Sequence, residues 1–402
     1  MYTMLYFIGE TWVKLLIEVF RTAWLWLPPV LCIAFYNLLY EWLQMRWRFI
    51  FFDRTILEIK LPEEITRSPK AMEFVLGALH ITTSGQTYDK WHDGQVRGWQ
   101  SLELVSYGGD IHFYITVRDK FAKHVESAIY AHYPEVEISE VDDYTAKLPY
   151  EMPGSDWSLW GCLWKMKKEE PKDAGRSINT YVDLGLDKES KEEFKVDPMI
   201  PLLEHLGQIG PNEQIWIQIV LRAVKSGDWI KPVEEFVKTL TFRDQEPEPG
   251  VFINFARQTM TKSESAFVEG IERKMFSQCF ETGIRAIYFS KVGHFNKLHV
   301  LPFLGIWKPV SGEGQGIDFA ISTTYDQPWE DPTGMRSKNL RDKFWREYRW
   351  RGWHYDPFKR RPAIMSTEEL ATLYHFPGSV AKTPGLQRIR SKKSEPPMNL
   401  PT

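Results

Sequence analysis

The sequence has little cysteine, and its thiols lie far apart. Only Cys32, Cys162 and Cys279 occur in 402 residues. An odd number of widely spaced cysteines does not build a disulfide framework or a four-cysteine zinc site. An excess of charge of one sign is also missing, because 50 Lys and Arg residues oppose 53 Asp and Glu residues and give a net charge of −3. The chain is therefore not a polycation, and any basic surface must be local.

The sequence motifs of common enzymes are missing too. The segment 378–383 has one glycine before its lysine, whereas a Walker A loop needs two to surround a phosphate. No Gly-x-Ser-x-Gly or His-x-x-x-His sequence occurs, which removes two further signatures of catalysis. Asp142 and Asp143 are interpreted as solvated residues at the end of a strand. We therefore expect no catalytic site, no metal site and no cofactor.

What is present is a long uncharged segment near the amino end. Residues 22–40 carry no charge, and as a helix they extend ~29 Å, which matches the hydrocarbon thickness of a bilayer. Aromatic residues near both ends are typical of membrane interfaces, and two adjacent prolines predict a kink. The expected anchor residues are Trp24, Trp26, Pro28, Pro29, Tyr36 and Tyr40. A buried pair of core helices is the alternative.

Flanking charge predicts how this segment is oriented. Arg46, Arg48 and Arg54 follow it, whereas Lys14 and Arg21 precede it. The positive-inside rule then places the carboxyl side, and with it the bulk of the chain, in the cytoplasm. Residues 1–20 are expected either to lie in the membrane interface or to form a second span.

The fold class predicted after an anchor at 1–50 is α/β (α+β), with two tandem ferredoxin-like domains. In residues 51–150, strand-like alternation at 57–61, 102–104, 111–117 and 136–138 is interrupted by helical patterns from Ser68 and from Phe121. The order β-α-β-β-α-β is that of a ferredoxin-like domain. Residues 151–310 repeat it with elaboration, including a strand at 182–186, an inserted helix at 229–240 and a capped helix from Thr261.

Residues 311–402 are predicted to form a loop, a basic aromatic helix and an extended basic tail. Aromatic residues such as Trp345 and Trp353 alternate with many cations. The candidate contacts to nucleic acid or to a membrane surface are Arg346, Arg349, Arg351, Lys359, Arg360 and Arg361. Cations interleaved with aromatic rings bind single-stranded nucleic acid or an anionic membrane surface. A solvated helix that packs its aromatic side chains on the sheet is the third interpretation.

Several segments together resemble a known family. They are 57–65 (Leu-Glu-Ile-Lys-Leu-Pro-Glu-Glu-Ile), 111–115, 128–134, 213–218, 281–285, 369–378 and 395–401. The chain resembles an uncharacterised membrane-protein family of candidate-phylum bacteria, which is associated with type IV secretion and conjugation-type motor ATPases. The resemblance implies a bacterial inner-membrane location and a motor ATPase partner on a separate polypeptide, and it brings no catalytic residues with it.

Three functional hypotheses follow from the sequence and the resemblance. The first is a membrane-anchored, non-catalytic, cytoplasm-facing scaffold of a type IV secretion-like or conjugation-like system for DNA or protein transfer, which docks the motor ATPase and forms an oligomer. The alternative is a membrane-tethered protein that binds single-stranded DNA through its basic aromatic C-terminal region. An enzyme with a site around Asp142 and Asp143 is a third hypothesis, which we disfavour.

Overall fold

The computed structural model describes most of the chain, in two compact units. The described residues are 2–50, 53–62, 65, 67–83, 85–148, 156–168, 170–187, 197–225, 227, 229–241, 261–312, 314–325, 327, 329–378, 385–386 and 388–389. One unit comprises residues 1–53 together with 83–97, and the other comprises 54–82 together with 98–402. The resembling segment 395–401 and the basic residues 390–393 lie outside the described residues.

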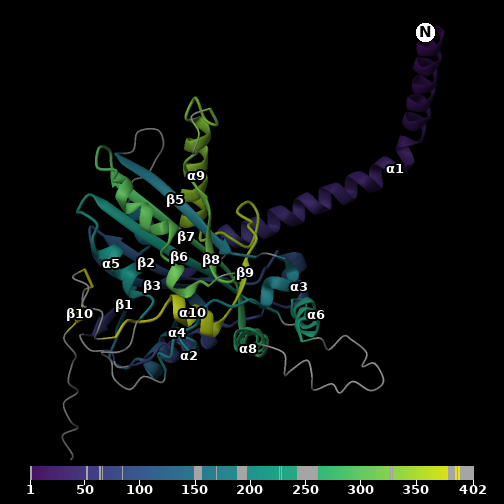
Figure 1. Ribbon diagram of the computed structural model, residues 1–402. Helices are drawn as coiled ribbons and strands as arrows, with labels where there is room; N and C mark the ends of the chain where they lie inside the picture. The colour runs from purple at the N-terminus through teal and green to yellow at the C-terminus, as the bar shows by residue number, and fades with distance from the viewer. Residues whose placement is uncertain are drawn as a thin grey trace, which may run out of the picture. The chain divides into compact units, whose positions relative to one another are not determined.

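The first unit is built on a single long helix. Helix α1 (Tyr2–Ile50) contains Pro28 and Pro29, and Figure 1 shows that it bends along its length. Residues 1–20, expected as a separate segment, are continuous with the anchor within α1 from Tyr2 onward. Its portion Ile17–Arg48 is long and apolar enough to span a membrane, and none of its most apolar stretch is buried. A short helix, α3 (Thr87–His92), also belongs to this unit.

The second unit contains a mixed α+β fold whose described strands form one ten-stranded sheet. Its strand order is β10-β1-β3-β2-β6-β7-β5-β8, with β4 also paired to β1 and β9 to β7. The strands are β1 (Arg54–Pro62), β2 (Gln100–Tyr107), β3 (Asp110–Arg118), β4 (Glu137–Val141), β5 (Trp157–Met166), β6 (Glu213–Ala223), β7 (Cys279–Lys291), β8 (Ile317–Ser322), β9 (Ala363–Ser366) and β10 (Arg388–Ile389).

The sheet contains two strand quartets with the same internal order. The first is β4-β1-β3-β2 and the second is β8-β5-β7-β6, and every pairing within each is antiparallel. The quartets join where β2 pairs with β6, for example Leu104 with Ile217. The two segments expected as tandem domains therefore share one continuous sheet (Figure 1).

The helices connect these strands largely as the sequence predicts. In the first half α2 (Lys70–Leu79) follows β1 and α4 (Asp119–His132) follows β3. In the second half α5 (Ile200–Gly207) follows β5, and α6 (Ile230–Leu240) and α8 (Lys262–Phe276) lie between β6 and β7. Three short 3-10 helices stand between β7 and β8, at 297–299, 301–304 and 308–310.

One predicted strand is wrong. The alternation of Val182, Leu184 and Leu186 indicated a strand, but residues 181–187 form consecutive turns. Their backbone hydrogen bonds are local, since the Leu184 amide donates to Thr180 and the Leu186 amide donates to Tyr181. Leu186 is buried whereas Leu184 is exposed, so the alternation of three apolar side chains does not form a strand without a pairing partner.

Residues 311–402 also differ from the predicted arrangement. The strands β8 and β9 within this range belong to the sheet, and α10 (Thr367–Leu373) packs against α2. The predicted basic helix is present as α9 (Met335–Arg349). The described residues up to Gly378 therefore contribute to the folded domain, whereas most of the expected extended tail lies outside the described residues.

The core has a layer on each face of the sheet. Alternate side chains of β1 point to opposite faces of the sheet: Leu57 and Ile59 belong to the larger hydrophobic cluster, and Ile56 belongs to the smaller one. Side chains from α2, α4, α5 and α10 join the larger cluster. Trp345 and Tyr348 of α9 join the smaller one with Trp216, so α9 covers the opposite face of the sheet.

Candidate functional site

The expected anchor residues lie on the exposed surface of α1. Trp24, Trp26 and Tyr36 have exposed side chains, and Tyr40 is half-buried. Pro28 and Pro29 lie inside the same helix. Between Ile17 and Met45 the helix exposes many aromatic and aliphatic side chains, which is typical of a segment that contacts lipid, because an exposed apolar surface of this extent is unfavourable in water.

Most aromatic residues of the basic segment face inward, whereas Trp350 is 38% exposed. Phe344, Trp345, Tyr348 and Trp353 are all buried, and Trp345 stands edge-on to Phe289 of the sheet, with ring centroids 5.5 Å apart. Base stacking needs exposed ring faces. These rings are therefore committed to the core, as the interpretation of a helix packed on the sheet predicted.

The six candidate basic residues differ in exposure: four are exposed, one is half-buried and one is buried. Arg346, Arg349, Lys359 and Arg361 are exposed. Arg360 is half-buried and donates to Glu347 at 2.9 Å. Arg351 is 2% exposed, so its guanidinium does not reach a nucleic acid or a membrane surface, and the structure removes Arg351 from the set of candidate contacts.

Helix α9 ends in a way that directs Arg351 inward. The Gly352 amide donates to the backbone carbonyl of Glu347, and the Arg351 amide donates to the backbone carbonyl of Tyr348. This is the hydrogen-bond pattern of a Schellman cap. Arg351 occupies the left-handed position of this cap, with φ of 51°. Glycine is usual there, because a side chain in this conformation costs about 1 kcal/mol or more. The Arg351 side chain must therefore make contacts that offset this cost.

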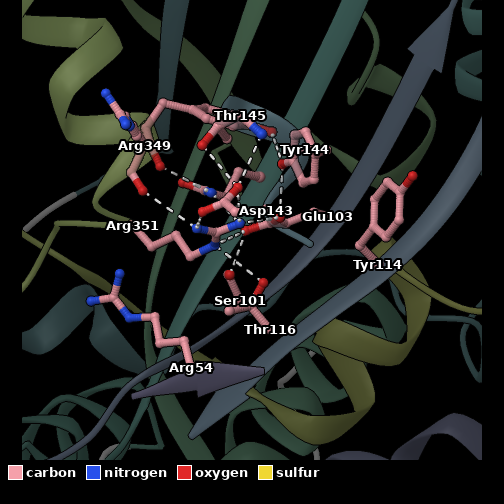
Figure 2. Close-up of polar contacts among 12 residues, drawn as sticks. Arg54, Ser101, Glu103, Tyr114, Thr116, Asp143, Tyr144, Thr145, Arg349 and Arg351 are labelled. Atoms are coloured by element: carbon pink, nitrogen blue, oxygen red, sulfur yellow. Dashed lines mark hydrogen bonds and ion pairs between the residues drawn. The ribbon is translucent and has the colours of Figure 1, made fainter. Parts of the chain in front are cut away.

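Those contacts are two carboxylates, Glu103 of β2 and Asp143 of the segment after β4 (Figure 2). Arg351 Nε donates to Glu103 Oε1 at 2.8 Å and to Thr116 Oγ1 at 3.1 Å, and Nη1 donates to Asp143 Oδ2 at 2.9 Å. Glu103 is fully buried. Burial would raise the pKa of the Asp143 carboxyl, but the Arg351 charge and donors from Thr145 outweigh burial and lower it. The group is therefore an ionic network that is buried at Arg351 and Glu103 and partly exposed at Asp143.

Further donors complete the coordination of Glu103. Ser101 Oγ lies 2.6 Å, Tyr144 OH 2.7 Å and Gln218 Nε2 2.7 Å from its oxygens. Tyr144 OH also lies 2.8 Å from Tyr348 OH of α9. Buried charges that are paired and fully hydrogen-bonded hold elements in one arrangement. The network therefore fastens α9 to β2, β3 and the segment after β4, and it has a structural role.

A cavity lies next to this network, on the same side of the sheet. It has a volume of about 410 Å³, and its lining includes Glu58, His112, Asp142, Lys147 and Trp216. His112 Nδ1 lies 2.7 Å from Glu58 Oε1. Asp142 is exposed directly after β4, as expected, and it also lines this cavity. Asp143 differs from the expectation, because it is half-buried and paired with Arg351.

The cavity's chemistry is limited among the described residues. An imidazole–carboxylate pair supports proton transfer, but the lining offers no thiol and no aliphatic hydroxyl. Burial raises the pKa of both Tyr107 and Tyr114, which keeps these phenols protonated. We therefore regard the cavity as able to bind a small molecule, with no activated nucleophile among its described walls.

The other groups considered from the sequence are also accounted for. Cys162 and Cys279 are buried, and burial raises the pKa of both thiols, that of Cys279 to about 12. Among the described residues, no cluster of three or more His, Cys, Asp or Glu side chains is arranged to hold a metal ion.

Sequence reasoning missed the ionic network and the cavity. The only sequence signal for the first was Glu103 between Leu102 and Leu104 in a strand, and for the second a histidine within the apolar run 111–117. In comparisons with known proteins, no family model and no curated protein matches the chain.

Proposed function

We propose that this protein is a membrane-anchored, non-catalytic scaffold that docks a separate motor ATPase of a type IV secretion-like system. The observation that carries the anchoring is helix α1, whose portion Ile17–Arg48 is long and apolar enough to span a membrane and is unburied in its most apolar stretch. The motor ATPase partner rests on the family resemblance. We also propose that the two strand quartets are two ferredoxin-like units, since both have the antiparallel order that this fold uses.

The basic outer face of α9 is the docking surface we assign to the motor. It consists of Arg336, Lys343, Arg346 and Arg349, all of which are exposed. The buried network and the inward-facing aromatic rings hold α9 rigidly on the sheet. A fixed row of cations favours an acidic partner surface and accelerates its association.

Crosslinking in the native membrane tests this proposal. The full-length chain is crosslinked, solubilised in detergent and purified, and the bound proteins are identified by mass spectrometry. We expect an ATPase with a Walker A motif, and we expect its recovery to fall in the Arg346→Glu/Arg349→Glu variant. The Lys231→Glu/Lys238→Glu variant on α6 carries the same charge change at exposed sites and is the matched control. Crosslinked material without an ATPase would overturn the proposal.

A second candidate function is nucleic-acid binding, and the same row of exposed cations on α9 supports it. With the rings of α9 buried, such binding would rest on charge alone and would weaken steeply with salt. Binding of single-stranded DNA that is independent of salt, or unchanged in Arg346→Glu/Arg349→Glu, would eliminate this function.

A further inference from the structure

Outside α1 itself, the first unit carries exposed aromatic residues on a second segment. Residues 85–97 contain the short helix α3, which exposes Tyr88 at 66% and Trp91 at 56%. The two residues are three positions apart, so they lie on one face of the helix. Asp89 closes a capping box with the Gln86 backbone amide, at 2.8 Å from its Oδ2. An ordered turn of helix thus presents two large rings to the surroundings.

This segment packs along α1 near the end of its uncharged stretch. The Trp91 ring stacks on Tyr40 with centroids 5.3 Å apart and on Tyr36 at 6.4 Å. Further along α1, Gly94 is so close that a Cβ atom there would lie 2.6 Å from Gln44 N. Its φ of 69° also favours glycine. The segment therefore follows α1 from Tyr36 to Gln44, over ~12 Å of helix.

The position along α1 fixes the depth of these rings. Tyr36 and Tyr40 are the last aromatic residues before Glu41, the first charge after the uncharged stretch. If α1 crosses a bilayer, this level is the boundary between hydrocarbon and headgroups, where Trp and Tyr are favoured. Polar neighbours on the segment, Lys90 and Asp93, suit the headgroup side of that boundary.

We propose that residues 85–97 are a second membrane contact, with Tyr88 and Trp91 inserted into the interface beside α1. The occupant of this aromatic surface is phospholipid. The inference rests on the proposed membrane anchoring and adds a site that the anchor residues did not include. It makes the membrane attachment a two-part structure, because a bare helix can rotate about its axis whereas a helix with an attached interfacial segment cannot.

Quenching by brominated lipids tests the proposal in the full-length chain. The chain is reconstituted in phosphatidylcholine vesicles in a Cys32→Ser background, where Cys162 and Cys279 are buried. An environment-sensitive fluorophore is attached at Tyr88→Cys. We expect stronger quenching by lipids brominated close to the headgroup than by lipids brominated at the chain end. A label at Leu31→Cys should show the reverse order, and a label at Lys123→Cys on α4 sets the background.

Two further variants show whether the contact with α1 holds the segment. Trp91→Ala removes the stacking on Tyr36 and Tyr40, and Gly94→Val drives the segment off the α1 backbone. Both should lower the quenching of the Tyr88→Cys label, whereas Trp91→Phe should preserve it. Deep quenching at Leu31→Cys with only background quenching at Tyr88→Cys would overturn this inference alone. Background quenching at both sites would overturn the membrane anchoring itself.

Discussion

Replacement of Arg351 by methionine is the sharpest test of how α9 is held. The change removes the charge that pairs with Glu103 and Asp143 while keeping an unbranched side chain. Glu103 is fully buried, and removing one partner of a buried ion pair costs about 3–5 kcal/mol. Glu103 keeps its hydrogen bonds from Ser101, Tyr144 and Gln218, which places the expected loss at the lower end, about 3 kcal/mol.

Three companion variants separate the causes. Arg351→Gly also removes the charge and relieves the left-handed backbone by about 1 kcal/mol, but it leaves the buried space of the side chain empty, so it should be no more stable than Arg351→Met. Glu103→Gln combined with Arg351→Met should recover part of the loss, because no unpaired charge then stays buried. Arg349→Met is the matched control, since this exposed side chain should change the stability by less than about 0.5 kcal/mol.

The assay is urea unfolding of the full-length chain in detergent micelles, followed by the fluorescence of its tryptophans. Trp216 and Trp345 lie in the cluster under α9, so loss of α9 packing should change the signal directly. If Arg351→Met costs no more than Arg349→Met, the network does not hold α9 and the reasoning is refuted.

Two further predictions concern packing and pH. Gly283→Ala would place a Cβ 2.0 Å from the Trp353 ring and should destabilise the fold by about 1–3 kcal/mol. Gly270→Ala in α8 has open space around the new Cβ and should stabilise the fold by up to about 1 kcal/mol. Thermal unfolding measures both changes, and equal effects would contradict the packing of Gly283 on Trp353. His375 Nδ1 lies 2.9 Å from the Ala371 carbonyl and Nε2 lies 3.1 Å from Asp197. Burial opposes the charge, but Asp197 and these acceptors raise the pKa of His375. Because the pKa of His375 is raised in the folded state, its protonation stabilises the folded protein most when the pH is below the unfolded-state pKa of about 6.5. This stabilisation is lost as the pH rises through the folded-state pKa. The free energy of unfolding, measured from below about pH 6.5 upward, should fall in the wild type and not in His375→Gln. A parallel fall in both proteins would contradict the role of the His375–Asp197 pair.

Local patterns in the sequence predicted the elements of the first half well. Alternation at 57–61 and 111–117 identified β1 and β3, and the pattern from Phe121 identified α4, because each element buries a regular face. The capping box of Thr261 and Glu264 is also present, with the Glu264 amide donating to Thr261 Oγ1.

Long-range features could not be predicted in the same way. Arg351 and Glu103 are 248 positions apart, and nothing in either neighbourhood indicates the other. The joining of the two halves through β2 and β6 depends on which strand edges meet, which alternation does not encode. The basic aromatic pattern predicts an exposed cation at Arg351, because composition does not show that a helix cap directs this side chain inward.

The same limit explains the cavity at Asp142. Its walls come from β1, the β2–β3 hairpin, β4 with the residues after it, and β6, and only the folded sheet brings these segments together. Sequence motifs identify catalysis when the residues are near neighbours, so a site assembled from four separate segments leaves no signature. The ring positions on α9 were similarly ambiguous, because buried and exposed aromatic residues have the same spacing along a basic helix.

Alkaline extraction of membranes that contain the full-length chain tests membrane anchoring most directly. The account predicts that the protein stays in the pelleted bilayer at high pH, since α1 is held by lipid contact along its unburied apolar stretch, and that only detergent releases it. Recovery of the intact chain in the supernatant as a monodisperse species without detergent would contradict the account.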